Sequence, residues 1–134
     1  YIEDNNITIW RLHDHMHMGS ETDYIYKGLL REIGWDKYLQ PDEKCPWIYQ
    51  IPKTTLGQLA YFFKKKLNMD TIQIIGDENM PITRICILVG GGSLGLGVEE
   101  IPMQVMERNK LDLIIAGDIT EWTLCAYIND AYQM

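Results

Sequence analysis

Residues 82–89 read ITRICILV and form the most apolar stretch of the sequence. A short apolar run that is rich in β-branched residues is typical of a strand buried on both faces of a sheet. Residues 111–116 predict a second buried strand. Shorter strands are predicted at residues 6–12, 47–51 and 71–75, where β-branched residues gather or alternate with polar ones.

Helices are predicted between these strands. The first runs to about Ile33, begins near Ser20 and Asp23, which have the spacing of a capping box, and stops at Gly34. A second begins after Thr54 or Thr55 and ends at Asn68. Two more are predicted at residues 99–108 and from residue 120 onward.

The resulting order is β-α-β-α-β-β-α-β-α, which predicts an α/β layered sheet flanked by helices. The length of 134 residues fits a single segment, 1–134, with a possible break at residues 41–46, where two prolines stand. The chain starts at Tyr1 and stops at Met134 within a predicted helix. We therefore expect an internal segment of a larger protein.

Composition excludes some partners. The net charge is −7, whereas a protein that contacts nucleic acid needs a basic face. No apolar run approaches the roughly 20 residues of a membrane-spanning helix. The cysteines Cys45, Cys86 and Cys125 are odd in number and widely spaced, which fits reduced thiols in the cytoplasm.

The most concentrated chemical signal is a histidine cluster. His13, His15 and His17 are the chain's three histidines, and they follow the predicted strand at residues 6–12. In an extended segment, residues two apart point to the same side, so the three imidazoles could share one face. Histidine is the commonest protein metal ligand, and sites in α/β sheets lie at the carboxyl ends of strands. The cluster predicts a metal site, with Asp14 orienting one imidazole.

A glycine-rich loop follows the strand at residues 82–89. Gly90, Gly92 and Gly95 fit the G-x-G-x-x-G spacing, with Gly91 between the first two, and Asp118 stands at the distance of a ribose partner. The backbone of Gly90, Gly91 and Gly92 is thus a candidate cofactor-binding element. Because carboxylates at residues 99 and 100 would repel a phosphate, a tight turn beside a site is the favoured interpretation.

A third motif, at residues 117–121, follows the strand at residues 111–116. Asp118 and Glu121 are candidate catalytic groups, because this strand end should lie beside the glycine loop. N-capping by Asp118 or Thr120 explains the same residues without catalysis.

Taken in order, these motifs resemble the Ngg-one-interacting-factor-three-like family, whose members are also known as type-2 GTP cyclohydrolase I homologues. The matching pieces are the strand that leads to His13 and His17, residues 47–66, residues 75–92, and the strand that ends at residues 116–118, Ala-Gly-Asp, where the family has Thr-Gly-Glu. The resemblance implies an α/β fold, a hexameric ring and a dinuclear metal centre.

The resemblance also implies a ligand set. The family has a histidine at the position of His13 and an aspartate at the position of His17. A carboxylate can bridge two metals and a neutral imidazole normally binds one, so one or two divalent ions (Zn, Mn or Fe) are expected, with His15 as a further ligand. The family's other ligands would precede Tyr1 and follow Met134. This segment alone is therefore expected to be inactive.

The leading hypothesis is a metal-dependent hydrolase, cyclohydrolase-like or acting on phosphoesters or amides, that works on an unidentified small molecule as a homo-oligomer. A non-enzymatic assembly or regulatory protein with a structural metal is the first alternative. A dinucleotide-binding unit on residues 90–97 is the second.

Overall fold

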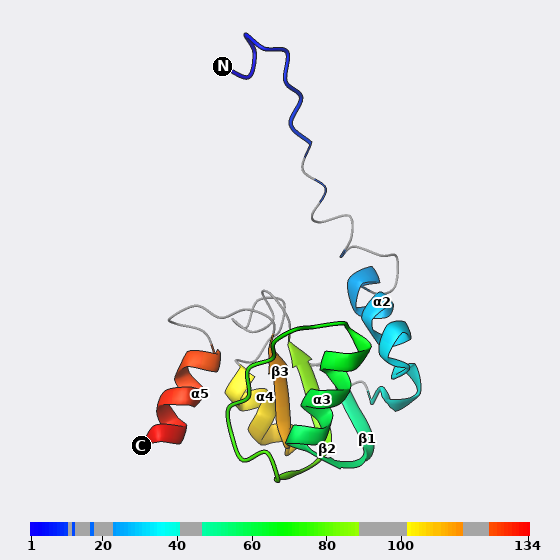
Figure 1. Cartoon of the computed structure of the whole chain (residues 1–134), viewed down its shortest axis with the longest axis vertical. Helices are drawn as coiled ribbons and strands as arrows, with labels where there is room; N and C mark the ends of the chain where they lie inside the picture. Colours follow the sequence, from blue (N-terminus) through cyan, green and yellow to red (C-terminus); the bar gives the residue numbers. More distant parts are fainter. Residues whose placement is uncertain (11, 13–16, 18–22, 41–46, 89–101, 117–123) are drawn as a thin grey trace. The chain divides into compact units, whose positions relative to one another are not determined.

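The computed structural model describes residues 1–10, 12, 17, 23–40, 47–88, 102–116 and 124–134. These residues form two compact units, Tyr1–Asp36 and Lys37–Met134. Strands and helices alternate along the second unit (Figure 1). The described part of the chain is a mixed α/β structure with a three-stranded sheet flanked by helices, which confirms the predicted fold class. The predicted break at residues 41–46 lies outside the described residues and stays a prediction.

Three strands form the sheet of the second unit: β1 (Ile48–Thr55), β2 (Pro81–Leu88) and β3 (Leu113–Ala116). Their order is β1-β2-β3, with β1 antiparallel and β3 parallel to β2. The strands predicted at residues 47–51, 82–89 and 111–116 are thereby confirmed. The most apolar stretch of the sequence forms the central strand β2. Its backbone N–H and C=O groups form hydrogen bonds with β1 on one side and with β3 on the other.

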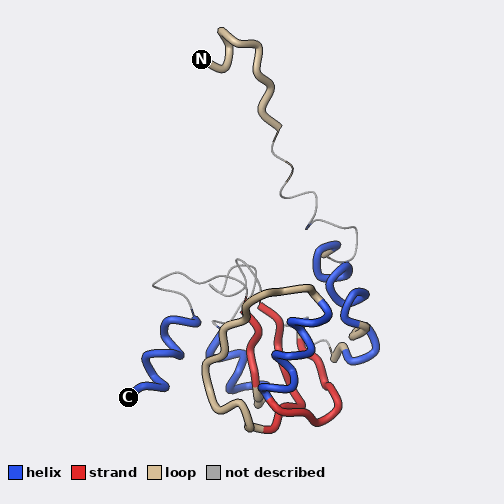
Figure 2. Tube along the Cα trace, viewed as in Figure 1, coloured by secondary structure: helices blue, strands red, loops and turns tan. Residues whose placement is uncertain are grey.

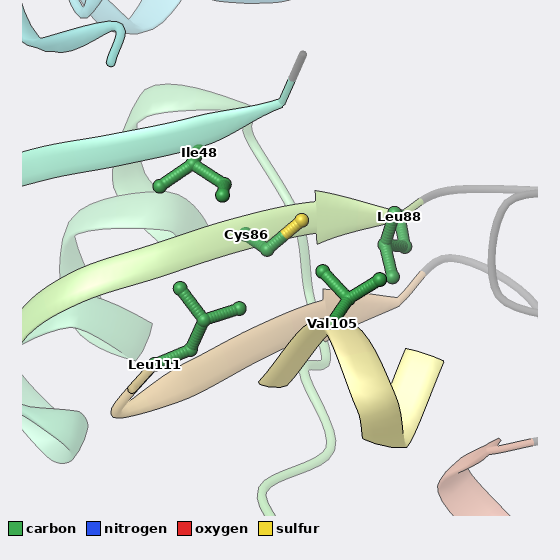
Figure 3. Packing of buried hydrophobic residues seen from close by; sticks show 5 residues of the cluster. All are labelled: Ile48, Cys86, Leu88, Val105 and Leu111. Atoms are coloured by element: carbon green, nitrogen blue, oxygen red, sulfur yellow. The ribbon is translucent and has the colours of Figure 1, made fainter. Parts of the chain in front are cut away.

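The core lies on both faces of β2. Four successive side chains, from Ile85 to Leu88, are fully buried, so neither face of the strand meets water. On one face, Cys86 and Leu88 point toward Val105 of helix α4 (Pro102–Asn109), as Figure 3 shows. Figures 1 and 3 show helix α3 (Leu56–Lys66) on the opposite face. Cys86 is therefore the small buried hydrophobe that its place in an apolar strand predicts.

Local sequence signals set the helix ends. Helix α2 (Tyr24–Ile33) is capped by Asp23, whose side chain accepts two backbone N–H groups, and ends at Gly34. Gly34 has φ 73°, a left-handed conformation that glycine adopts without a steric penalty. The predicted stop is confirmed, and the N-cap is Asp23 itself. Ser20 lies outside the described residues.

Helix α3 is capped by Thr55, one of the two residues that the sequence predicts as its cap, and Gln58 completes a capping box. Thr55 accepts the backbone N–H of Gln58, and the Gln58 side chain accepts the backbone N–H of Thr55. Helix α4 starts with Pro102 in its first turn, and helix α5 (Leu124–Gln133) closes the described chain.

Two predicted strands, at residues 6–12 and 71–75, are not formed among the residues that the structure describes. Residues 7–10 have no regular structure, and Ile9 and Trp10 are 71% and 78% exposed. Residues 71–75 are likewise irregular, and Figure 2 shows them within the loop between α3 and β2. Both predictions rested on local composition, but β-propensity measures fit to a pleated surface and requires a neighbouring strand. In the described chain, neither segment has one.

Candidate functional site

His17 is the one residue of the predicted histidine cluster that the structure describes. Its Nδ1 lies 2.7 Å from Oδ2 of Asp23, within hydrogen-bond distance. The imidazole is 37% exposed and the Asp23 side chain 14% exposed. The histidine is thus held by a largely buried carboxylate at the start of α2 and still reaches solvent.

Asp23 is fixed on its other oxygen. Its Oδ1 accepts the backbone N–H groups of Ile25 and Tyr26, at 2.8 and 3.1 Å. These donors are the otherwise unsatisfied groups at the first turn of α2. One carboxylate therefore caps the helix and binds the imidazole, so the orientation of the histidine is tied to the helix start.

This geometry suits a metal ligand. When His17 is neutral with its proton on Nδ1, that nitrogen donates to Asp23 and the lone pair lies on Nε2. A carboxylate on the second ring nitrogen is the usual partner of a metal-binding histidine, because it fixes the tautomer and raises the basicity of the ligating nitrogen. The sequence had suggested Asp14 for this role. For His17 the partner is Asp23, six residues away, which sequence reasoning used as a capping residue alone.

The other candidates of the cluster lie outside the described residues. These are His13, Asp14 and His15, so the convergence of the three imidazoles stays a prediction. Within the described part of the chain, no three histidine, cysteine or acidic side chains are grouped as a metal site would require.

The strands that lead to the other two motifs end side by side. In the parallel pairing of β2 with β3, Leu88 stands opposite Ala116. The sequence continues from these two residues into the glycine loop and into Gly117-Asp118. The prediction that both strands end at the same edge of the sheet is confirmed. Gly90, Gly91, Gly92, Asp118 and Glu121 themselves lie outside the described residues.

Asp112 is a carboxylate whose part in the fold sequence reasoning missed. Its Oδ2 accepts the backbone N–H groups of Thr83 and Arg84 and the Thr83 hydroxyl, at 2.8 to 2.9 Å. Burial raises the pKa of Asp112, but the three donated hydrogen bonds outweigh it and hold the pKa below the ordinary value of 3.8. The one polar residue in the apolar stretch 111–116 was the available signal. Its role is to fasten β3 to β2.

No helix in the described ranges combines the length and the apolar character that crossing a membrane demands. The comparison with curated proteins finds no match. Among solved structures, a Bacillus cereus protein related to NIF3 matches with 18% identity and a TM-score of 0.49, covering 65% of this chain and 21% of that one. Staphylococcus aureus protein SA1388 matches with 23% identity and a TM-score of 0.48, covering 84% of this chain and 38% of that one.

The chain thus spans well under half of the length of either solved structure. The family model of DUF34/NIF3 (NGG1p interacting factor 3) matches residues 4–133, which is nearly the whole sequence. The match includes the histidine cluster, the glycine loop and the strand that precedes Asp118. The chain therefore belongs to the DUF34/NIF3 family.

Proposed function

We propose that this chain contributes to a divalent metal site, with His13, His15 and His17 as ligands, in a metal-dependent hydrolase. The observation that carries the proposal is the 2.7 Å contact between His17 Nδ1 and Asp23 Oδ2. Zn, Mn and Fe all accept imidazole nitrogen, so the donor set fits one or two of these ions.

The role of Asp23 follows from its two oxygens. Because Oδ1 is held by backbone N–H groups of α2, Oδ2 has a fixed position from which it orients His17. A preorganised imidazole loses less rotational freedom when it binds an ion. Asp23 is therefore a positioning residue in this proposal, and His17 is the ligand.

Hydrolysis needs an activated water. A bound divalent ion would lower the pKa of that water and polarise the carbonyl or phosphoryl oxygen under attack. Asp118 or Glu121 would accept the proton of the water, since both follow β3, whose end lies beside the end of β2. The substrate is a small molecule of phosphoester, amide or cyclohydrolase type, and the active form is a homo-oligomer, with the hexamer as the expected state.

Metal content of the full-length protein tests the ligand assignment. The protein is loaded with Zn²⁺, Mn²⁺ or Fe²⁺ and measured by elemental analysis, beside a variant that carries both His13→Ala and His17→Ala. We expect bound metal in the parent and a clear loss in the variant. Equal metal content in both would refute the assignment.

Asp23→Asn separates metal positioning from helix capping. Asparagine caps helices about as well as aspartate, so the stability of α2 should be nearly unchanged. Loss of the carboxylate on the imidazole should weaken metal affinity by about 10- to 100-fold. Asp36→Asn, an exposed carboxylate in the same unit, is the matched control and should leave the affinity unchanged. A normal metal affinity in Asp23→Asn would show that Asp23 serves only as a helix cap.

A second candidate is a non-enzymatic assembly or regulatory protein with a structural metal, since the family description refers to an interacting factor. A catalytic site keeps one coordination position for water, and a structural site is closed by protein ligands. Turnover of a phosphoester, nucleotide or amide by the metal-loaded full-length protein would support the hydrolase. A tightly bound metal without any turnover would support the second candidate.

The third hypothesis is dinucleotide binding on residues 90–97, and titration with NAD or FAD tests it.

A further inference from the structure

The C-terminal end of helix α2 is closed by backbone hydrogen bonds and by packing. The backbone N–H of Gly34 donates to the carbonyl oxygen of Arg31. The backbone N–H of Trp35 donates to the carbonyl oxygen of Leu30, at 2.9 Å. This pair of bonds is the Schellman motif, and the side chains of Leu30 and Trp35 are both buried. The end of the helix is therefore fixed without any contribution from His17.

The start of α2, in contrast, depends on one residue. The side chain of Asp23 accepts the backbone N–H groups of Ile25 and Tyr26. Its carbonyl oxygen accepts the backbone N–H of Lys27, at 3.0 Å. The side chains of Tyr24 and Ile25 are exposed, so packing contributes less here than at the other end. The first turn of the helix is thus held through Asp23.

The length and composition of α2 make its start sensitive to this cap. The helix has 10 residues, and helices shorter than about 12 residues are marginal unless the surrounding structure supports them. Gly28 stands in the middle of the helix, where glycine is less favourable than alanine because it loses more backbone freedom. The population of the first turns should therefore follow how firmly the carboxylate of Asp23 is held.

The imidazole of His17 decides how firmly that carboxylate is held. A neutral histidine has two tautomers, and only the one with its proton on Nδ1 can donate to Oδ2 of Asp23. A metal ion on Nε2 excludes the other tautomer, so a metal-bound His17 always has the proton that Asp23 needs. The side chain of His17 is 37% exposed, and ligation would fix an imidazole that solvent otherwise reaches.

We propose that metal binding at His17 stabilises the start of α2 through Asp23, so that the N-terminal half of the helix is more fully formed in the metal-loaded protein. This inference rests on the proposed role of His17 as a ligand and adds a conformational response to it. Because coupling between two sites is reciprocal, a more stable helix start must also raise the metal affinity. Helix α2 thus links occupancy of the metal site to the surface that Tyr24 and Ile25 expose.

Hydrogen exchange of the full-length protein tests this response, with and without Zn²⁺, while elemental analysis measures the bound ion. Zn²⁺ should slow the exchange of residues 25–29 by about fivefold, the factor that an N-cap typically contributes. Residues 32–35 should change less, because their end of the helix is closed by the Schellman motif. Residues 82–88 of β2 are the internal reference and should not change.

Asp23→Ser separates the helix cap from the imidazole. Serine caps a helix about as well as aspartate, but its single oxygen on a shorter side chain stays with the backbone N–H groups of α2. At a Zn²⁺ concentration that saturates the variant, residues 25–29 should exchange at the same rate as in the Zn²⁺-free variant. A slowing by Zn²⁺ that persists in Asp23→Ser would contradict the proposed route through Asp23.

Gly28→Ala tests the reciprocal effect. The Cβ that alanine adds would meet no described atom within 4 Å, so the substitution strengthens the helix without a clash in the described chain. Zn²⁺ affinity should rise by about two- to fivefold, although residue 28 is not a ligand. Tyr61→Ala, at an exposed position of α3, is the matched control and should leave the affinity unchanged. An unchanged affinity in Gly28→Ala would overturn the coupling.

Failure of this inference is distinct from failure of the metal site. A parent protein that binds Zn²⁺ without slower exchange at residues 25–29 would overturn the inference and leave the metal site in place. Equal slowing at residues 25–29 and 82–88 would also overturn it, because the ion would then stabilise the protein as a whole. Absence of bound Zn²⁺ in the parent would refute the proposed metal site and this inference with it.

Discussion

Asp23 and Asp112 both stand at the start of an element and both accept several hydrogen bonds, yet they act over different ranges of sequence. Asp23 binds His17, Ile25 and Tyr26, all within six residues. Asp112 binds Thr83 and Arg84, 28 to 29 residues earlier. A carboxylate that acts locally fixes one helix start, whereas one that joins distant strands fixes the register of the sheet.

The largest effect should come from Asp112→Ala. The substitution removes three hydrogen bonds to a charged group and leaves the backbone N–H groups of Thr83 and Arg84 without their acceptor. We expect the free energy of unfolding to fall by about 3 kcal/mol, measured by urea denaturation. Asp112→Asn keeps one carbonyl oxygen as acceptor and should cost less. A loss below about 0.5 kcal/mol for the alanine variant would show that β3 is held by its ladder alone.

Acid should weaken the hydrogen bonds that Asp112 accepts from Thr83 and Arg84. The hydrogen bonds from Arg84 and Thr83 outweigh burial and lower the pKa of Asp112 below 3.8 in the folded state. A carboxyl group with a lowered folded pKa contributes stability above its unfolded pKa and loses it as the pH falls through the folded value. The free energy of unfolding should therefore decrease below about pH 4, and this part of the decrease should be absent from Asp112→Asn. An identical acid profile in both proteins would contradict the assignment.

Asp23→Ala should have the smallest effect on stability. It removes one N-cap, which typically costs about 1 kcal/mol, and the loss should be confined to α2. Hydrogen exchange of residues 24–33 measures it, with residues 82–88 as the internal reference. Equal loss of protection in both regions would show that Asp23, like Asp112, supports the fold as a whole.

The parts of the fold that sequence predicted are those with a local physical cause. The apolar run at residues 82–89 favours a strand buried inside a sheet, and residues 82–88 lie in the central strand β2. Thr55 caps α3 through the backbone N–H of a residue three positions later, and Gly34 ends α2 because glycine adopts φ 73° without a steric penalty. Each of these features depends only on residues that lie close together in the sequence.

The parts that sequence missed depend on partners elsewhere. Residues 7–10 and 71–75 have strand composition, but composition does not say whether a neighbour is present. The contacts of Asp112 cross 28 residues, and nothing in the spacing of Thr83, Arg84 and Asp112 marks them as a group. Asp23 lies only six residues from His17, but its place before α2 indicates a helix cap and does not indicate the imidazole as a second partner.

The parallel pairing of β2 with β3 also has a consequence for folding. Ile85 pairs with Leu113, so α4 and its connections must be in place before the two strands can meet. Closing such a long loop costs chain entropy before the hydrogen bonds between β2 and β3 can offset that cost, so this pairing forms slowly. β1 and β2 can associate earlier, around α3. Among the three described strands, we therefore expect Leu113–Ala116 to join the sheet last and to leave it first when the native protein opens locally.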